Sequence, residues 1–159
     1  MKILLISGME CVGKTTSIRR LTETLIKDNG FQPENGVKVP SRPTEDFKII
    51  LYKNDFRIII NSASDNIGII DSFKFFFEEN ILQGYNILIS SVRDDDFYPR
   101  KDFFETINQL SQISDFTLEI PLAKTTRRGD NLDIQLKWYE EKIDSLLTHI
   151  LECQPYNIP

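Results

Sequence analysis

Gly8-Met9-Glu10-Cys11-Val12-Gly13-Lys14-Thr15 is the stretch that decides the fold, and it directly follows the apolar run Lys2-Ile3-Leu4-Leu5-Ile6-Ser7. It matches the phosphate-binding pattern G-x-x-x-x-G-K-[ST]. The glycines let backbone amides point inward at a phosphate, the lysine reaches the β- and γ-phosphates, and the threonine hydroxyl is placed to ligate Mg²⁺. Ile18, Leu21 and Leu25 then recur at helical spacing, which predicts a strand, a loop and a helix N-terminus in that order. We therefore predict that the chain binds a nucleoside triphosphate.

The predicted nucleotide site takes in this whole loop and the residue after it. The residues expected to hold ATP are Gly8, Met9, Glu10, Cys11, Val12, Gly13, Lys14, Thr15 and Thr16. Lys14 is also a predicted catalytic residue, because phosphoryl transfer needs alignment and charge neutralisation more than covalent help from the protein. Thr15 is the predicted ligand of Mg²⁺.

Strand and helix patterns alternate along the chain, which predicts an α/β fold with three αβα layers and a mostly parallel central sheet. With the loop motif at its start, the chain resembles the P-loop NTPases, which implies the fold of that superfamily. Two β-rich runs, 47–51 and 56–60, are separated by the polar residues Tyr52-Lys53-Asn54-Asp55. This spacing indicates an antiparallel hairpin, so the sheet is expected to be mixed.

The remaining boundaries follow from start and stop signals. The first helix is expected to end near Gly30, and a short strand is expected at 37–39. A helix capped by Asp65 or Asn66 should run to about residue 83. Further elements are a strand at 86–92, a helix at 100–112, a strand at 116–120 and a helix at 131–151. Residues 1–153 are predicted to form one domain, and residues 154–159 a loosely held tail.

Composition narrows the function classes. The chain has 159 residues, a net charge of −5 and 40% hydrophobic residues, which suits one packed core and offers no basic stripe for stable nucleic-acid binding. No segment reads as a signal peptide or a membrane span, and two cysteines make no disulfide framework, so we expect a cytoplasmic protein without membrane contact. The Phe-rich segment 73–77 offers an apolar face for a homodimer.

The loop also resembles that of the thymidylate kinase family, in which an acidic residue stands at the position of Glu10 and a second threonine, here Thr16, follows the Mg²⁺ ligand. Arg42, in Val39-Pro40-Ser41-Arg42-Pro43, resembles the family's arginine that approaches the acceptor phosphate. Arg93 resembles the arginine of the family's Asp-Arg pair, with Val92 in place of the acid. Arg127 and Arg128 resemble the arginines of the lid in nucleoside monophosphate kinases.

The sequence is consistent with two roles for Asp65. It follows an apolar run and is a candidate Mg²⁺ ligand acting through water, and it is equally a candidate helix N-cap. Asp65-Asn66-Ile67-Gly68 also fits the D-x-x-G switch signature of small GTPases. The chain contains no Asn-Lys-x-Asp guanine-reading element, however, which argues against a guanine-specific switch.

The sequence is consistent with two functions. The resemblance implies a Mg²⁺-dependent kinase that transfers the γ-phosphate of ATP to a small phosphorylated acceptor. In it Arg42 and Arg93 would hold the acceptor, Arg93 would also serve catalysis, and Arg127 or Arg128 would close over the transition state. The alternative is a regulatory ATP-binding or ATP-hydrolysing module that acts on a protein partner, favoured by the hairpin and by Val92.

Overall fold

The computed structural model describes residues 1–80, 84–94, 98–110, 116–124 and 132–159. Its elements follow in the order β1 (Lys2–Ser7), α1 (Lys14–Lys27), β2 (Gln32–Pro33), the short 3₁₀ helix η1 (Glu34–Gly36), β3 (Lys48–Lys53), β4 (Phe56–Asn61), α2 (Ile67–Asn80), β5 (Ile87–Val92), α3 (Tyr98–Leu110), β6 (Phe116–Pro121) and α4 (Leu132–Glu152). Strands and helices alternate as predicted, and the chain has an α/β fold.

The described strands form one six-stranded, mostly parallel sheet in the order β2-β3-β4-β5-β1-β6. β1 lies between β5 and β6 and runs parallel to both, and β4 runs parallel to β5. β3 and β4 pair antiparallel from Lys48 opposite Asn61 to Lys53 opposite Phe56, which confirms the predicted hairpin. The register also aligns Ser7 with Val92 and with Pro121. The loops that follow β1, β5 and β6 therefore all start at the same end of the sheet, the one formed by the carboxyl ends of these strands.

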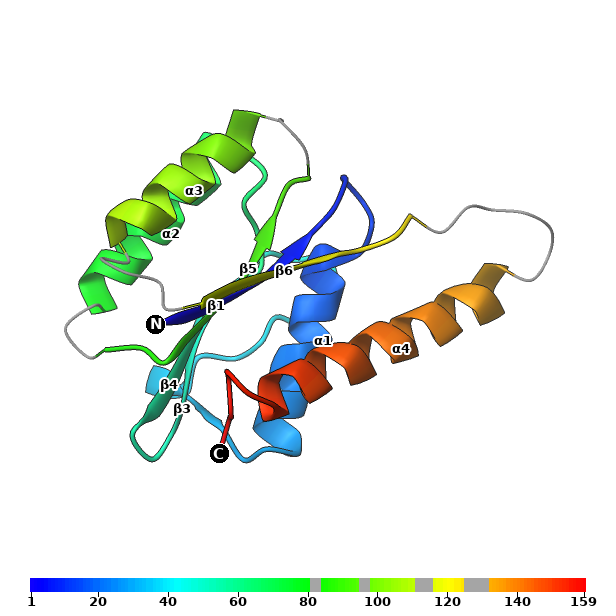
Figure 1. Ribbon diagram of the computed structural model, residues 1–159, viewed down its shortest axis with the longest axis horizontal. Coiled ribbons are helices and arrows are strands. Elements are labelled where there is room, and N and C mark those ends of the chain that lie inside the picture. Colours follow the sequence, from blue (N-terminus) through cyan, green and yellow to red (C-terminus); the bar gives the residue numbers. More distant parts are fainter. Residues whose placement is uncertain (81–83, 95–97, 111–115, 125–131) are drawn as a thin grey trace.

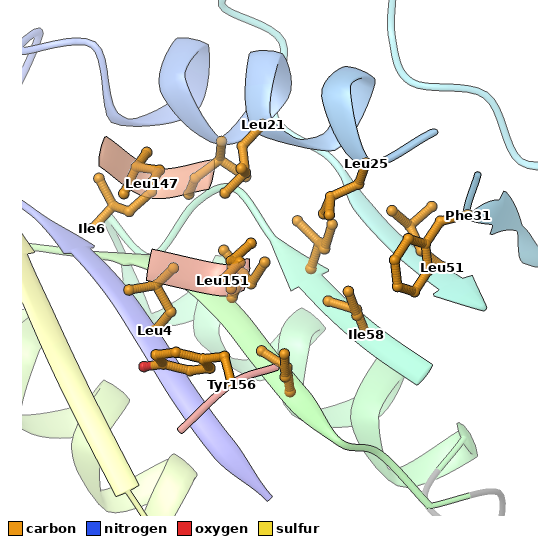
Figure 2. Packing of buried hydrophobic residues seen from close by; sticks show 14 of the residues in the cluster. Leu4, Ile6, Leu21, Leu25, Phe31, Leu51, Ile58, Leu147, Leu151 and Tyr156 are labelled. Atoms are coloured by element: carbon orange, nitrogen blue, oxygen red, sulfur yellow. The ribbon is translucent and has the colours of Figure 1, made fainter. Parts of the chain in front are cut away.

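Helices cover both faces of the sheet, with α1 and α4 on one side and α2 and α3 on the other (Figure 1). On the first side, Leu21 and Leu25 of α1 and Leu147 and Leu151 of α4 pack over Leu4 and its neighbours in the sheet (Figure 2). The sheet is buried from both sides, which explains why β1, β4 and β5 are nearly continuous apolar runs.

A second hydrophobic core lies on the side of the sheet covered by α2 and α3, and it buries most of the Phe-rich segment 73–77. Phe73 and Phe77 are buried between α2, α3 and the sheet, and Phe73 lies 6.1 Å from Phe103 between ring centroids. Phe75, by contrast, is 67% exposed. Most of the apolar surface foreseen for a homodimer is therefore used within the chain, and the homodimer stays a prediction.

The strand predicted at 37–39 is wrong. The second strand is instead Gln32–Pro33, which pairs with Tyr52 and Leu51 at the edge of the sheet. Phe31 decides this, because its side chain is fully buried and packs edge-on against Phe56. The chain is thereby held beside β3 before it reaches Val37, and an edge position tolerates the missing amide hydrogen of Pro33.

The tail also differs from the prediction that residues 154–159 are loosely held. Tyr156 is 1% exposed and donates a hydrogen bond of 2.6 Å from its hydroxyl to the carbonyl oxygen of Ile3. The amide of Ile158 donates to the carbonyl oxygen of Leu151. Figure 2 shows the Tyr156 ring beside Leu4 and Leu151. The physical reason is the burial of a large aromatic ring whose polar tip also finds an acceptor. In the part of the chain that the structure describes, no helix has the length and apolar character needed to cross a membrane.

Candidate functional site

The loop between β1 and α1 has a backbone that depends on its glycines. Gly8 has φ 148°, and a Cβ atom there would lie 2.8 Å from a methyl group of Val12 and 3.3 Å from the carbonyl oxygen of Leu122. Gly13 has φ 94° and is the N-cap of α1. Cys11 also adopts a positive φ, of 59°. The loop therefore curls back over the start of α1, whose first amides lack intrahelical acceptors and favour an anion.

Lys14, the first residue of α1, folds its side chain under this loop. It is 7% exposed, and its Nζ donates to the carbonyl oxygens of Gly8 at 2.8 Å and Met9 at 2.7 Å. Burial lowers the pKa of Lys14 below its ordinary value of 10.5, while the negative charge of Asp65 opposes this change and Arg93 adds to it. A buried cation at the N-terminus of a helix is suited to bind a multiply charged anion.

A cavity of about 360 Å³ opens beside the loop. The residues that line it are Glu10, Cys11, Gly13, Lys14, Thr15, Thr16, Thr44, Asp46 and Asp65. Most residues of the predicted nucleotide site thus line one cavity, and Asp65 lines it as well. Gly8, Met9 and Val12 belong to the loop but do not line the cavity. Met9 is 52% exposed, and Val12 packs against the core.

Asp46, which sequence reasoning missed, lies beside the predicted metal ligand. The Oγ1 of Thr15 is 3.2 Å from Oδ1 of Asp46 and 3.3 Å from the carbonyl oxygen of Ser62. Ser62 also fixes Phe47, since its Oγ accepts from the Phe47 amide at 2.8 Å and its own amide donates to the Phe47 carbonyl oxygen. This pairing holds the segment before β3 beside the residue that follows β4, and Thr15 of α1 contacts both. Hydroxyl, carboxylate and carbonyl oxygens therefore meet there, all of them ligands that suit Mg²⁺.

Asp65 is not the cap of α2. Asn66 takes that place, because its Oδ1 accepts from the amide of Ile69 at 3.0 Å. Asp65 instead forms an ion pair with Arg93, with Oδ1 2.8 Å from Nε, and Arg93 also lies 3.6 Å from a carboxylate oxygen of Glu10. Glu10 and Asp65 line the cavity, and Arg93, which follows β5, links their two carboxylates. No described contact joins Asp65 to Thr15.

Arg93 is held in place by a second arginine that the sequence did not single out. Arg100 of α3 donates to the carbonyl oxygen of Arg93 at 2.8 Å and makes a two-pronged ion pair with Glu119 of β6, at 3.0 and 2.8 Å. The hydrogen bonds from Arg100 hold the pKa of Glu119 below its ordinary value of 4.5. This pair ties the backbone that follows β5 to the edge of the sheet.

Among the residues that the structure describes, no arginine lines this cavity, and Arg93 is linked to it through its ion pairs with Glu10 and Asp65, which do. Arg42 is exposed in the segment before β3 and does not line the space beside Lys14. Arg127 and Arg128 lie outside the described residues. Asp46, in contrast, had no sequence signal, because its role depends on contact with Thr15, 31 positions away in the chain.

Comparisons with known proteins give no relative from which a function can be transferred, because no family model, no curated protein and no solved structure matches the chain.

Proposed function

We propose that this protein is a P-loop NTPase that acts as a Mg²⁺-dependent phosphotransferase, similar to nucleoside monophosphate kinases, and transfers the γ-phosphate of ATP to a small phosphorylated acceptor. The observation that supports this most is the arrangement around Lys14. A glycine-dependent loop curls over a helix N-terminus, and the buried ammonium group of Lys14 lies directly beneath it. These features together are typical of loops that bind a phosphate chain.

Lys14 would contact the β- and γ-phosphates of ATP. In the free protein its ammonium group is satisfied by the carbonyl oxygens of Gly8 and Met9, so no unpaired charge is buried before the nucleotide arrives. On binding, phosphate oxygens would join or replace these carbonyl oxygens. Because the group is largely shielded from water, its attraction to the charge that develops on the transferred phosphoryl group is strong.

Thr15 and Asp46 fit a role in holding Mg²⁺, since a hydroxyl and a carboxylate oxygen lie 3.2 Å apart on the wall of the same cavity. When bound, the ion would neutralise charge on the phosphates. Asp46 would supply the acid that the resemblance leads one to expect at Val92, which is fully buried and apolar. Asp65 would act through Arg93 or through water.

Arg93 is the proposed link to the acceptor phosphate. Its side chain is 12% exposed, and the guanidinium group is positioned by Asp65, with Glu10 of the loop at 3.6 Å. An incoming phosphate would compete with Glu10 for this group. Arg127 and Arg128 keep their predicted role at the transition state, whereas the role of Arg42 at the acceptor stays a prediction, because Arg42 does not line the cavity.

The proposal is tested by ADP release from ATP and Mg²⁺, measured alone and with a panel of nucleoside and deoxynucleoside monophosphates, in the wild type, Lys14→Ala and Lys101→Ala. Lys101 is a matched control because its side chain is 81% exposed on α3. We expect ADP release that requires one monophosphate, is lost in Lys14→Ala and is retained in Lys101→Ala. Unchanged ATP affinity and turnover in folded Lys14→Ala would refute the proposal.

A regulatory ATPase is the second candidate, favoured by the charged bridge from Glu10 through Arg93 to Asp65. A γ-phosphate in the cavity would disturb these ion pairs and so alter the segments that carry them. Slow ADP release that is indifferent to every monophosphate, yet still depends on Lys14, would favour this function over the kinase.

A further inference from the structure

A second cavity, of about 310 Å³, adjoins the first, and Asp46 lines both. It lies between the start of β3, the end of β4 and the first turns of α2. The residues around it are Asp46, Phe47, Lys48, Asn61, Ala63, Gly68, Ile69 and Ser72. Its volume is at the lower end of the range found for small-molecule sites. A ligand here would be next to a phosphate chain held at Lys14.

Lys48 gives this cavity a cation. Among the residues that the structure describes, its ammonium group has a hydrogen bond to the hydroxyl of Ser72 and no ion pair with a carboxylate. Burial lowers its pKa below the ordinary value of 10.5. A partly desolvated ammonium group that is paired with a neutral hydroxyl gains from an anionic ligand, because the anion restores the interaction that water gave it.

Asn61 gives the cavity a hydrogen-bond acceptor. This side chain is 1% exposed, and its Nδ2 donates to the carbonyl oxygen of Ala63 at 2.7 Å and to Oγ of Ser90 at 3.0 Å. Both amide hydrogens are therefore used, and Oδ1 is the atom of the group that remains to accept from a ligand N–H. Phe47, Ala63 and Ile69 make the rest of the wall mainly apolar.

We infer that this second cavity is the acceptor site, an inference that rests on the proposed function. The substrate class that its chemistry fits is a monophosphate attached to a flat ring with an N–H donor, as in a nucleoside monophosphate. Lys48 contacts the anionic part, and Oδ1 of Asn61 accepts from the ring. Lys48 thereby performs the role that the resemblance implied for Arg42, which lines neither cavity.

In the transfer step, the acceptor supplies the attacking oxygen and ADP is the leaving group. A phosphate oxygen of the monophosphate forms a bond to the γ-phosphorus of ATP. The bond from that phosphorus to the oxygen bridging the β- and γ-phosphates breaks, and its electron pair leaves with ADP. Asp46 lies at the junction of the two cavities, where its charge repels phosphate unless a cation is bound beside it.

The test compares Lys48→Met and Ser72→Ala with Lys74→Met, a lysine on the same helix α2 as Ser72 whose side chain does not line the cavity. MgATP affinity and the KM of the monophosphate that supports ADP release are measured separately. Because a charge-assisted contact contributes about 1.5–3 kcal/mol, Lys48→Met should raise that KM about 10- to 150-fold. MgATP affinity should stay within twofold of the wild type in all three variants. An unchanged KM in Lys48→Met would overturn the inference while leaving the proposed function intact.

A failure of the proposed function would look different, because no variant would then support ADP release. In that case the binding of the same nucleoside monophosphates to the wild type and to Lys48→Met is measured by calorimetry. Binding that is lost in Lys48→Met and kept in Lys74→Met supports the second cavity as a monophosphate site. Equal binding in all variants, or no binding to the wild type, overturns the inference.

Discussion

Replacing Asp46 by asparagine tests the least expected feature of the proposed site. The substitution keeps the size of the side chain and a hydrogen-bonding group 3.2 Å from Oγ1 of Thr15, but it removes one negative charge from the cavity wall. Thr15 retains the carbonyl oxygen of Ser62 at 3.3 Å as an acceptor, so the fold should be unaffected. Any change in nucleotide binding then reports on the charge.

The sign of the effect depends on Mg²⁺. With Mg²⁺ present, loss of a carboxylate that holds the ion removes a charge-assisted interaction of about 1.5–3 kcal/mol, which is about a 10- to 150-fold weaker affinity for MgATP. With the ion chelated, the same carboxylate only repels the phosphates, so Asp46→Asn should bind ATP more tightly than the wild type. The two effects have opposite directions because the carboxylate of Asp46 attracts Mg²⁺ but repels the phosphates of ATP.

Titration of ATP with excess Mg²⁺ and with chelator measures both effects, with Glu45→Gln as the control. Glu45 neighbours Asp46 and is exposed, but it does not line the cavity. We expect Glu45→Gln to follow the wild type under both conditions. Equal ATP affinities for Asp46→Asn and the wild type with Mg²⁺ present would refute the assignment of Asp46 to the ion.

Two further predictions concern the framework. Tyr156→Phe removes the buried hydrogen bond to Ile3 and should lower the free energy of unfolding by about 1–2 kcal/mol, seen as a Tm lower by about 2–8 °C in a thermal scan; an unchanged Tm would mean that the tail is loose after all. Because the pKa of Glu119 is lower in the folded protein than its ordinary 4.5, its ion pair with Arg100 stabilises the fold above pH 4.5 and loses this contribution as the pH falls through the folded value. Urea unfolding should therefore show Glu119→Gln less stable than the wild type by about 1 kcal/mol at pH 7, allowing for solvent screening, and a smaller difference at pH 3; a difference that is independent of pH would contradict this.

The elements that the sequence predicted well are those with a local signal. The hairpin was predictable because two β-rich runs flank a short polar segment, and the structure pairs Lys53 with Phe56 at its end. The end of the first helix was predictable from Gly30, which adopts φ 74°. The strand at 37–39 was predicted wrongly because Phe31, whose burial directs the chain, looked like a loop residue until its partner Phe56 was known.

The sequence by itself determined the strand, loop and helix that carry Lys14 and Thr15, because glycine conformations, helical spacing and the order of the motif all act within about 30 residues of chain. Only the tertiary structure decided what surrounds them. Asp46 reaches Thr15 across 31 positions, and Tyr156 reaches Ile3 across 153. Such contacts depend on which strands pair and which helices cover them, and these in turn depend on burying apolar surface over the whole chain, so no local pattern encodes them.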